Sequence, residues 1–194
     1  MNLSDAVVGY AMTGSFCTLA ESLKCLAELK EKCRMVVPIM SFNAASIDTR
    51  FGKAEDFRKK IEEICGKPII CSINDAEPIG PKKLLDILVI LPCSGNTTTK
   101  ISLGITDTPV THAAKSHLRN ERPLLIGIST NDALSGTAKN IGALLNTRNV
   151  FFIPISQDNP DNKPRSVVAV FSMLIPSLEL ALAGKQIQPI LWKQ

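Results

Sequence analysis

The chain contains 194 residues, of which 45% are hydrophobic and 21% are charged, a balance typical of a globular protein with a sizeable core. Its formal net charge is only +4, and its lysines and arginines are scattered, which speaks against a nucleic-acid-binding surface. The first residues, MNLSDAVVGY, lack the basic start and apolar segment of a secretion signal, and no apolar run is long enough to span a membrane.

Apolar runs alternate with amphipathic stretches along the whole chain. The apolar runs predict strands over residues 6–12, 34–40, 67–73, 84–92, 123–129 and 149–156. The amphipathic stretches predict helices over residues 16–32, 53–66, 96–107, 109–120, 133–146 and 166–184. Strands that alternate with helices favour parallel βαβ units, so we expect one α/β domain over residues 1–194, with helices on both faces of a parallel sheet.

Prolines refine this prediction. Pro68 has no N–H group to donate to a neighbouring strand, so the strand 67–73 should lie near an edge of the sheet. Pro176 should kink the last predicted helix. Three segments lack a regular pattern and are expected to form two mobile loops and a tail that packs on a neighbouring molecule, namely 43–52, 157–165 and 185–194.

Six cysteines lie in the first half of the chain, at positions 17, 25, 33, 65, 71 and 93. None forms a Cys-x-x-Cys pair, which speaks against a zinc site, so no bound metal is expected. Without a secretion signal the thiols should stay reduced, and we expect them to fill core volume. Cys17, Cys25 and Cys33 recur every eight residues, which favours one face of one helix.

Small polar residues follow the predicted strands. Four strands end in a tripeptide that begins with serine and ends with asparagine, at Ser41, Ser72, Ser94 and Ser129, and residues 13–15 (Thr-Gly-Ser) follow the first strand. The carboxyl ends of parallel strands meet at one edge of a sheet, where ligands bind. Two explanations remain open. The residues cap the following helices, or they join the free helix N–H groups in holding an anion through neutral donors, without a lysine.

The stretch from Pro92 to Asp107 carries the most specific pattern. It reads Pro-x-Ser-x-Asn-Thr and then Lys-Ile-x-x-Gly-Ile-x-Asp, while the segment GYAMTGS precedes the first predicted helix. These motifs resemble the flavoprotein superfamily that contains the homo-oligomeric flavin-containing cysteine decarboxylases. Further segments, such as SFNAASIDTRFGKAEDF and ISTNDALSGTAKNIGALLN, resemble the family of dipicolinate synthase B subunits of spore-forming bacteria, over about residues 4–191.

The resemblance implies a Rossmann-like, flavodoxin-related fold, homo-oligomers such as trimers or dodecamers, and FMN bound near a subunit interface. It implies that the first, second and fourth predicted strands hold the phosphate and ribityl chain, with the fifth nearer the ring. The residues that it assigns to the cofactor are Thr13, Gly14, Ser15, Ser41, Asn43, Ser94, Gly95, Asn96, Thr97, Ser129 and Thr130. It also implies a cytoplasmic location, in the mother cell of a sporulating bacterium.

The same resemblance implies an A subunit as partner, which brings NAD(P), and oxidation of a dihydrodipicolinate-type intermediate to dipicolinate. Arg50 is the candidate for a substrate carboxylate, with a merely solvated turn as the alternative, and the catalytic residues are otherwise not predicted. His112 and His117 lie too far along the chain to match the decarboxylase histidine, and the decarboxylase substrate motif has no counterpart. An assembly partner with a vestigial pocket and a flavin prenyltransferase or decarboxylase remain alternatives.

Overall fold

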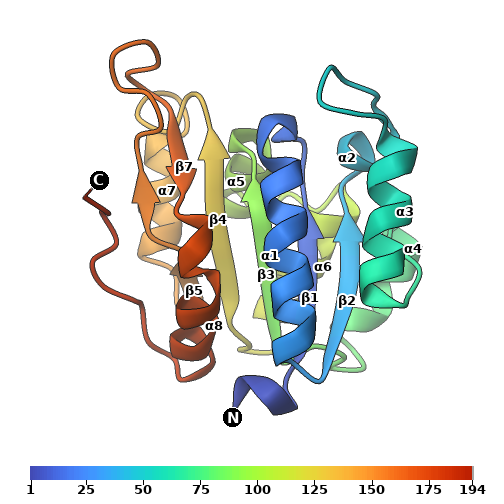
Figure 1. Cartoon of the computed structure of the whole chain (residues 1–194). Coiled ribbons are helices and arrows are strands. Elements are labelled where there is room, and N and C mark those ends of the chain that lie inside the picture. The colour runs from blue at the N-terminus through green and yellow to red at the C-terminus, as the bar shows by residue number, and fades with distance from the viewer. Residues whose placement is uncertain (194) are drawn as a thin grey trace.

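The computed structural model describes residues 1–193 and is built on a seven-stranded sheet (Figure 1). The strands are β1 (Val7–Met12), β2 (Met35–Met40), β3 (Ile87–Cys93), β4 (Leu124–Thr130), β5 (Val150–Phe152), β6 (Ile155–Ser156) and β7 (Val167–Ala169). Their order is β2-β1-β3-β4-β7-β6, and β5 pairs with the first half of β4. The strands β1 to β5 run parallel, whereas β7 is antiparallel to both β4 and β6.

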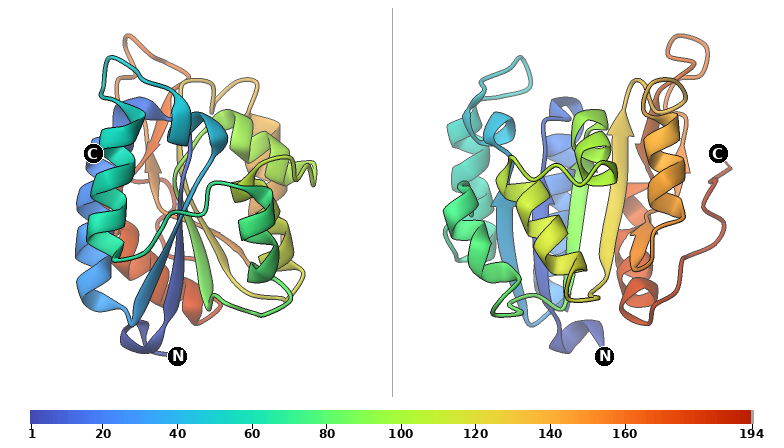
Figure 2. Two further views of the ribbon diagram at one scale, coloured as in Figure 1. Left: turned by 90° about the vertical axis from the view of Figure 1, so that its right-hand side faces the viewer. Right: turned by 180° about the vertical axis from the view of Figure 1, so that it is seen from behind.

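Helices cover both faces of this sheet. They are α1 (Leu19–Lys32), α2 (Phe42–Ser46), α3 (Ala54–Cys65), α4 (Ile73–Ala76), α5 (Gly95–Ser102), α6 (Pro109–Leu118), α7 (Ala138–Leu145) and α8 (Leu174–Leu182). Four short 3₁₀ turns accompany them, η1 (Leu3–Asp5), η2 (Phe16–Thr18), η3 (Glu77–Ile79) and η4 (Phe171–Met173). Figures 1 and 2 show α1, α3 and α8 on one face, with α5, α6 and α7 on the other.

The core forms two layers because successive strand residues point to opposite faces. All seven residues of β3 are buried, as expected for a central strand with helices on both sides. One layer combines alternate residues of β1 and β3 with the apolar faces of α1, α3 and α8. The other combines the remaining strand residues with α6 and α7. The predicted α/β architecture with helices on both faces is therefore confirmed.

Two predicted elements are wrong. The segment 67–73 forms only a single bridge, between Ile70 and Ile39 of the edge strand β2, and then enters α4. The segment 166–184 is not one helix, because its first residues form β7 before η4 and α8 begin. A short apolar run rich in valine suits a strand as well as a buried helix, and periodicity alone does not separate them. Pro176 occupies the first turn of α8. The N–H groups of a first turn have no acceptor within the helix, so proline removes no hydrogen bond there and does not kink the helix.

Other boundaries also differ from the prediction. Pro154 separates β5 from β6, so the segment 149–156 is two strands, and the expectation of an entirely parallel sheet fails at β6 and β7. The predicted loop 43–52 begins within α2. The helices predicted over 96–107 and 133–146 are shorter, as α5 ends at Ser102 and α7 begins at Ala138.

The tail lies along the molecule's own sheet. The Gln186 side chain accepts from the Phe152 N–H and donates to the Phe152 carbonyl, both at 2.7 Å. Further on, the Trp192 N–H donates to the Ile155 carbonyl at 2.9 Å. Packing of this tail on a neighbouring molecule stays a prediction. Among the described residues, no helix is both long and apolar enough to cross a membrane.

All six cysteines are free thiols, as expected for reduced side chains. Cys65 and Cys93 are buried, and burial raises the pKa of the Cys93 thiol to about 12, so this group stays protonated. Cys17 is exposed, which corrects the expectation that every cysteine fills the core. Within residues 1–193 no group of three or more His, Cys, Asp or Glu side chains is arranged to hold a metal ion.

Candidate functional site

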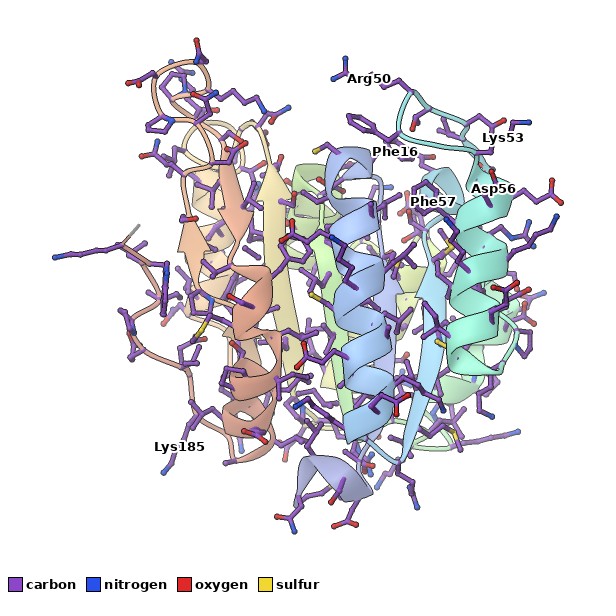
Figure 3. All side chains as sticks on the ribbon, viewed as in Figure 1. Phe16, Arg50, Lys53, Asp56, Phe57 and Lys185 are labelled. Atoms are coloured by element: carbon purple, nitrogen blue, oxygen red, sulfur yellow. The ribbon has the colours of Figure 1, made fainter. Side chains whose placement is uncertain are left out.

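A depression of about 310 Å³ lies where β1, β2 and β3 end, at the edge from which the loop around Arg50 projects in Figure 3. Its volume is at the lower end of the range for small-molecule sites. Six of the predicted site residues line it, namely Gly14, Ser41, Asn43, Ser94, Asn96 and Thr97. Four further residues complete the wall, namely Phe42, Lys100, Asp107 and Thr108. We call this depression the cradle.

One side of the cradle is the N-terminus of α5. Ser94 caps this helix, and its hydroxyl accepts from the Thr97 N–H at 3.4 Å. The first-turn N–H groups of Gly95 and Asn96 have no acceptor within the helix, because the turn that would supply one lies before its start. These groups and the positive end of the helix dipole make this end of α5 suited to an anion.

Thr13 supports this end without lining the cradle. Its buried hydroxyl donates to the Pro92 carbonyl at 2.8 Å and accepts from the Ser94 N–H at 2.9 Å. The two bonds tie the end of β1 to the end of β3, and so fix Ser94 relative to Gly14. Thr13 is therefore a positioning residue for the cradle.

The opposite wall combines Gly14 with the start of α2. Ser41 caps α2 by accepting from the Ala44 N–H at 3.3 Å, and its own N–H donates to Met12. A methyl group at Gly14 would stand 3.7 Å from the Phe16 ring and 3.8 Å from the Asn43 Cβ. Such a group would occupy space that glycine leaves open, so glycine lets a ligand approach the backbone closely.

Two further predicted residues, Ser15 and Ser129, form hydrogen bonds with each other instead of lining the cradle. The Ser15 hydroxyl donates to the Ser129 carbonyl at 2.7 Å, and its Oγ lies 2.9 Å from the Ser129 Oγ. The Ser129 Oγ also lies 3.1 Å from the Thr18 Oγ1. These bonds join the loop after β1 to the end of β4, across β3. Neither Ser15 nor Ser129 lines the cradle, although the sequence suggested both as ligands.

Gly95 and Thr130 also pack against other residues of the protein, at the loop after β4. Asp132 accepts from the Thr130 hydroxyl at 2.6 Å and from the Thr137 hydroxyl at 2.8 Å. A methyl group at Gly95 would approach the Asp132 carboxylate and the Thr130 hydroxyl to 2.7 Å each, which is too close. Gly95 is thus needed where α5 packs against the loop after β4.

The sequence did not suggest the aromatic and charged parts of the wall. Phe42 lines the cradle, and the Phe16 ring stands beside Gly14. The ammonium group of Lys100 donates to both carboxylate oxygens of Asp107 at 2.8 Å. The expectation of a wholly uncharged wall is therefore incomplete, although Asp107 offsets the charge of Lys100. The available signal was the Lys-to-Asp spacing of the family motif, together with an aromatic residue between Ser41 and Asn43.

Arg50 is not part of the lining of the cradle. Figure 3 shows it at the tip of a projecting loop, on the same edge as Phe16. Two backbone hydrogen bonds between Thr49 and Gly52, of 3.0 and 3.1 Å, close this loop. The guanidinium carbon lies 4.9 Å from the centroid of the Phe51 ring, and Arg50 is exposed.

Both histidines lie outside the cradle. His117 is buried and its Nε2 donates to the Pro123 carbonyl at 3.0 Å. Burial lowers the pKa of His117 to about 4, so the ring is neutral at physiological pH. His112 lines a separate hollow with Glu77 and Ser116. Neither ring is placed to act as an acid or base at the cradle.

Comparisons with known proteins agree with this fold. The family model described as Flavoprotein matches residues 2–175. The dipicolinate synthase B chain of Bacillus subtilis (strain 168) is 45% identical over 190 residues, which cover 98% of this chain and 95% of that protein. A crystal structure of the corresponding dipicolinate synthase chain from Bacillus halodurans C is 43% identical, covers 100% of both chains and superposes with a TM-score of 0.90. An FMN-dependent cysteine decarboxylase structure is 19% identical, covers 93% of this chain and 99% of its own, and gives a TM-score of 0.69.

Proposed function

Because the chain belongs to the Flavoprotein family, and within it to the dipicolinate synthase B subunits, we propose that the cradle holds FMN in a two-subunit dehydrogenase. The partner is an A subunit that supplies NAD(P), and the product is dipicolinate, made in the mother-cell cytoplasm during sporulation. The observation that carries the proposal is the meeting of three strand ends around one depression. Small hydroxyl and amide groups line it, and glycine at position 14 keeps it open.

The donor set fits the phosphate and polyol of a mononucleotide. The N–H groups of Gly95 and Asn96 and the Asn96 amide are the donors for the phosphate. The Ser41 hydroxyl accepts from α2 and keeps its own proton to donate. Thr97 and Asn43 are polar partners for the ribityl hydroxyls. In this assignment Ser15, Ser129 and Thr130 support the loops around the cradle and leave the cofactor to the residues of β1, β2 and β3.

Aromatic side chains suit the flavin ring. Phe42 lines the cradle and the Phe16 ring borders Gly14, so a planar group has apolar faces to rest on. Bound FMN would supply an acceptor for a hydride, which no side chain can store. The chain's own residues would orient the ring and hold it beside the edge where the Arg50 loop projects.

Arg50 is the proposed contact for a carboxylate of the substrate. Its planar fork matches a carboxylate with two parallel hydrogen bonds, and Phe51 supports it from below. Aromatisation of a dihydropyridine dicarboxylate removes one hydride and one proton, and Arg50 would keep the ring in place while both depart. Replacing Arg50 with glutamine should raise the Michaelis constant of the complete complex and leave the fold intact, as circular dichroism would check.

Reconstitution tests the proposal most broadly. The purified chain is mixed with its A subunit and the dihydropyridine precursor, and FMN and NAD(P) are omitted in turn. The proposal expects dipicolinate, followed by its ultraviolet absorbance, to need this chain and FMN together. Full activity without FMN, in protein first stripped of any bound flavin, would contradict the proposal.

A second candidate function is an assembly partner with a vestigial pocket. The bonds between Ser15 and Ser129 favour it, because they remove two hydroxyls that the family resemblance assigns to the cofactor. Such a scaffold would stimulate the A subunit equally with and without flavin, and would stay colourless after incubation with FMN. A decarboxylase or prenyltransferase is less well supported, since neither histidine reaches the cradle.

A further inference from the structure

A second depression, of about 420 Å³, lies between the end of α5, the outer face of α6 and the segment after α7. Ile101, Ile105 and Leu118 supply its apolar surface, and Lys115 and Arg119 stand at its side. The remaining lining residues are Gly104, Thr106, Thr111, Thr147 and Arg148. We call this depression the α6 groove.

Apolar side chains around the groove are unusually exposed. Ile105 in the groove is 41% exposed, while Leu103 and Leu145, which come just before lining segments, are 65% and 48% exposed. Single exposed leucines are ordinary, but several around one hollow are typical of a surface that another molecule covers. The groove alone is smaller than a standard protein interface, so a docked segment would also cover residues beside it.

The charged residues that line the groove are all cations. Its lining contains three cations, and within the described residues 1–193 it contains no carboxylate. Lys115 donates to the Gly104 carbonyl at 3.3 Å, and Arg148 meets Glu121 at 3.5 Å with both side chains more than 70% exposed. A pair so exposed contributes little. The Arg119 guanidinium has no ion-pair partner among residues 1–193.

We infer that the α6 groove receives an acidic, apolar segment of the partner subunit, an inference that rests on the two-subunit function proposed above. An amphipathic helix with apolar residues three or four apart and carboxylates beside them would place its apolar side chains on Ile105 and Leu118. Its carboxylates would meet Arg119 and Arg148. Because the cations flank an apolar floor, a protein segment fits this groove better than a nucleic acid does.

The groove and the cradle share a wall. Residues 100–108 supply Lys100, Asp107 and Thr108 to the cradle and the segment 104–106 to the groove. The ion pair between Lys100 and Asp107 and the hydrogen bond from the Ile105 N–H to the Lys100 carbonyl, at 2.8 Å, fasten this wall. A partner on the groove therefore contacts the back of the proposed flavin site, so partner and FMN should alter each other's affinity by the same factor.

The test uses calorimetry to measure the dissociation constant of the complex between this chain and its A subunit. Ile105→Asp and Arg119→Glu should each weaken the complex about tenfold or more, since each removes a central contact. The matched control is Arg34→Glu, because Arg34 is exposed and follows α1, on the face of the sheet opposite α6. Circular dichroism and FMN titration of each variant check folding and the cradle.

Three outcomes would overturn the inference. If the wild-type chain binds the A subunit and both groove variants bind it equally well, the groove is not the docking site, while the proposed function stands. If the wild-type chain does not bind the A subunit at all, the groove inference and the two-subunit function both fail. If the variants lower only the self-associated mass in light scattering, the groove is a contact between copies of this chain.

Discussion

The edge formed by the carboxyl ends of the strands has two halves made from the same kinds of residue. The open half is the cradle at β1, β2 and β3, and the closed half is the end of β4, where these residues bond to other parts of the protein. At β1, β2 and β3, Ser41 and Ser94 cap helices, and the Ser41 hydroxyl keeps its proton while the Asn43 and Asn96 amides line the cradle. At β4, the hydroxyls of Ser129 and Thr130 are already engaged with Ser15 and Asp132. A small polar residue at a strand end is therefore a ligand candidate only when its own neighbours leave its hydrogen-bonding groups unused.

We expect the largest loss of stability from a substitution in the closed half. Gly95→Ala places a methyl group 2.7 Å from Asp132 and Thr130, and should lower the free energy of unfolding by about 2–3 kcal/mol. The same change should weaken FMN binding, because it displaces the start of α5. Urea unfolding measures the first effect. The control is Gly142→Ala, a helical position with nothing within 4 Å, which should stabilise the protein by about 0.5–1 kcal/mol.

A substitution in the open half should lower FMN affinity without lowering the free energy of unfolding. Asn96→Ala removes an exposed amide from the cradle and should cost about 1–3 kcal/mol of FMN affinity, or roughly 5- to 150-fold. The free energy of unfolding should stay within about 0.5 kcal/mol of the wild-type value. Calorimetric titration with FMN measures the affinity. Asn146→Ala, at the exposed end of α7, is the matched control, and equal affinities for the two variants would remove Asn96 from the site.

A milder change in the closed half separates stability from binding. Ser129→Ala removes the contacts of its hydroxyl with Ser15 and Thr18 but keeps the bond from Ser15 to the main-chain carbonyl. It should cost about 1 kcal/mol of stability and leave FMN affinity almost unchanged. A loss of affinity without a loss of stability would show that Ser129 belongs with the ligands after all.

The smallest effect concerns the charged wall. Asp107→Asn removes the partner of Lys100, whose ion pair is partly exposed and so contributes little to the fold, less than about 1 kcal/mol. The freed ammonium group should strengthen FMN binding several-fold, because the phosphate is an anion, and added salt should diminish this gain. Titrations at low and high ionic strength measure both. Weaker binding in this variant would mean that Asp107 itself contacts the ligand.

The sequence predicted the layered fold well because its signals are local. The strand β3 is a continuous apolar run, and first-turn prolines and strand-end serines mark where helices start. The predicted secondary structure was wrong where it depends on pairing with residues distant in the sequence. The valines of β7 form a strand only because the edge of β4 is available to them, and the segment 67–73 pairs at a single residue.

The site was predictable in outline for a similar reason. Parallel strands bring their ends to one edge, so the meeting of Gly14, Ser41 and Ser94 follows from topology. The partners of Ser15 do not follow from it, because its bond to Ser129 spans 114 residues and depends on how the loops lean across β3. The basic and apolar groove along α6 was not anticipated either, since its residues come from three separate elements.

A crystal structure of the chain grown with FMN would test most directly whether the cradle holds the flavin phosphate. We expect the phosphate within hydrogen-bonding distance of the Gly95 and Asn96 N–H groups, with the bonds between Ser15 and Ser129 intact. A phosphate seated instead on Ser15 and Ser129, or FMN bound away from the cradle, would contradict this expectation.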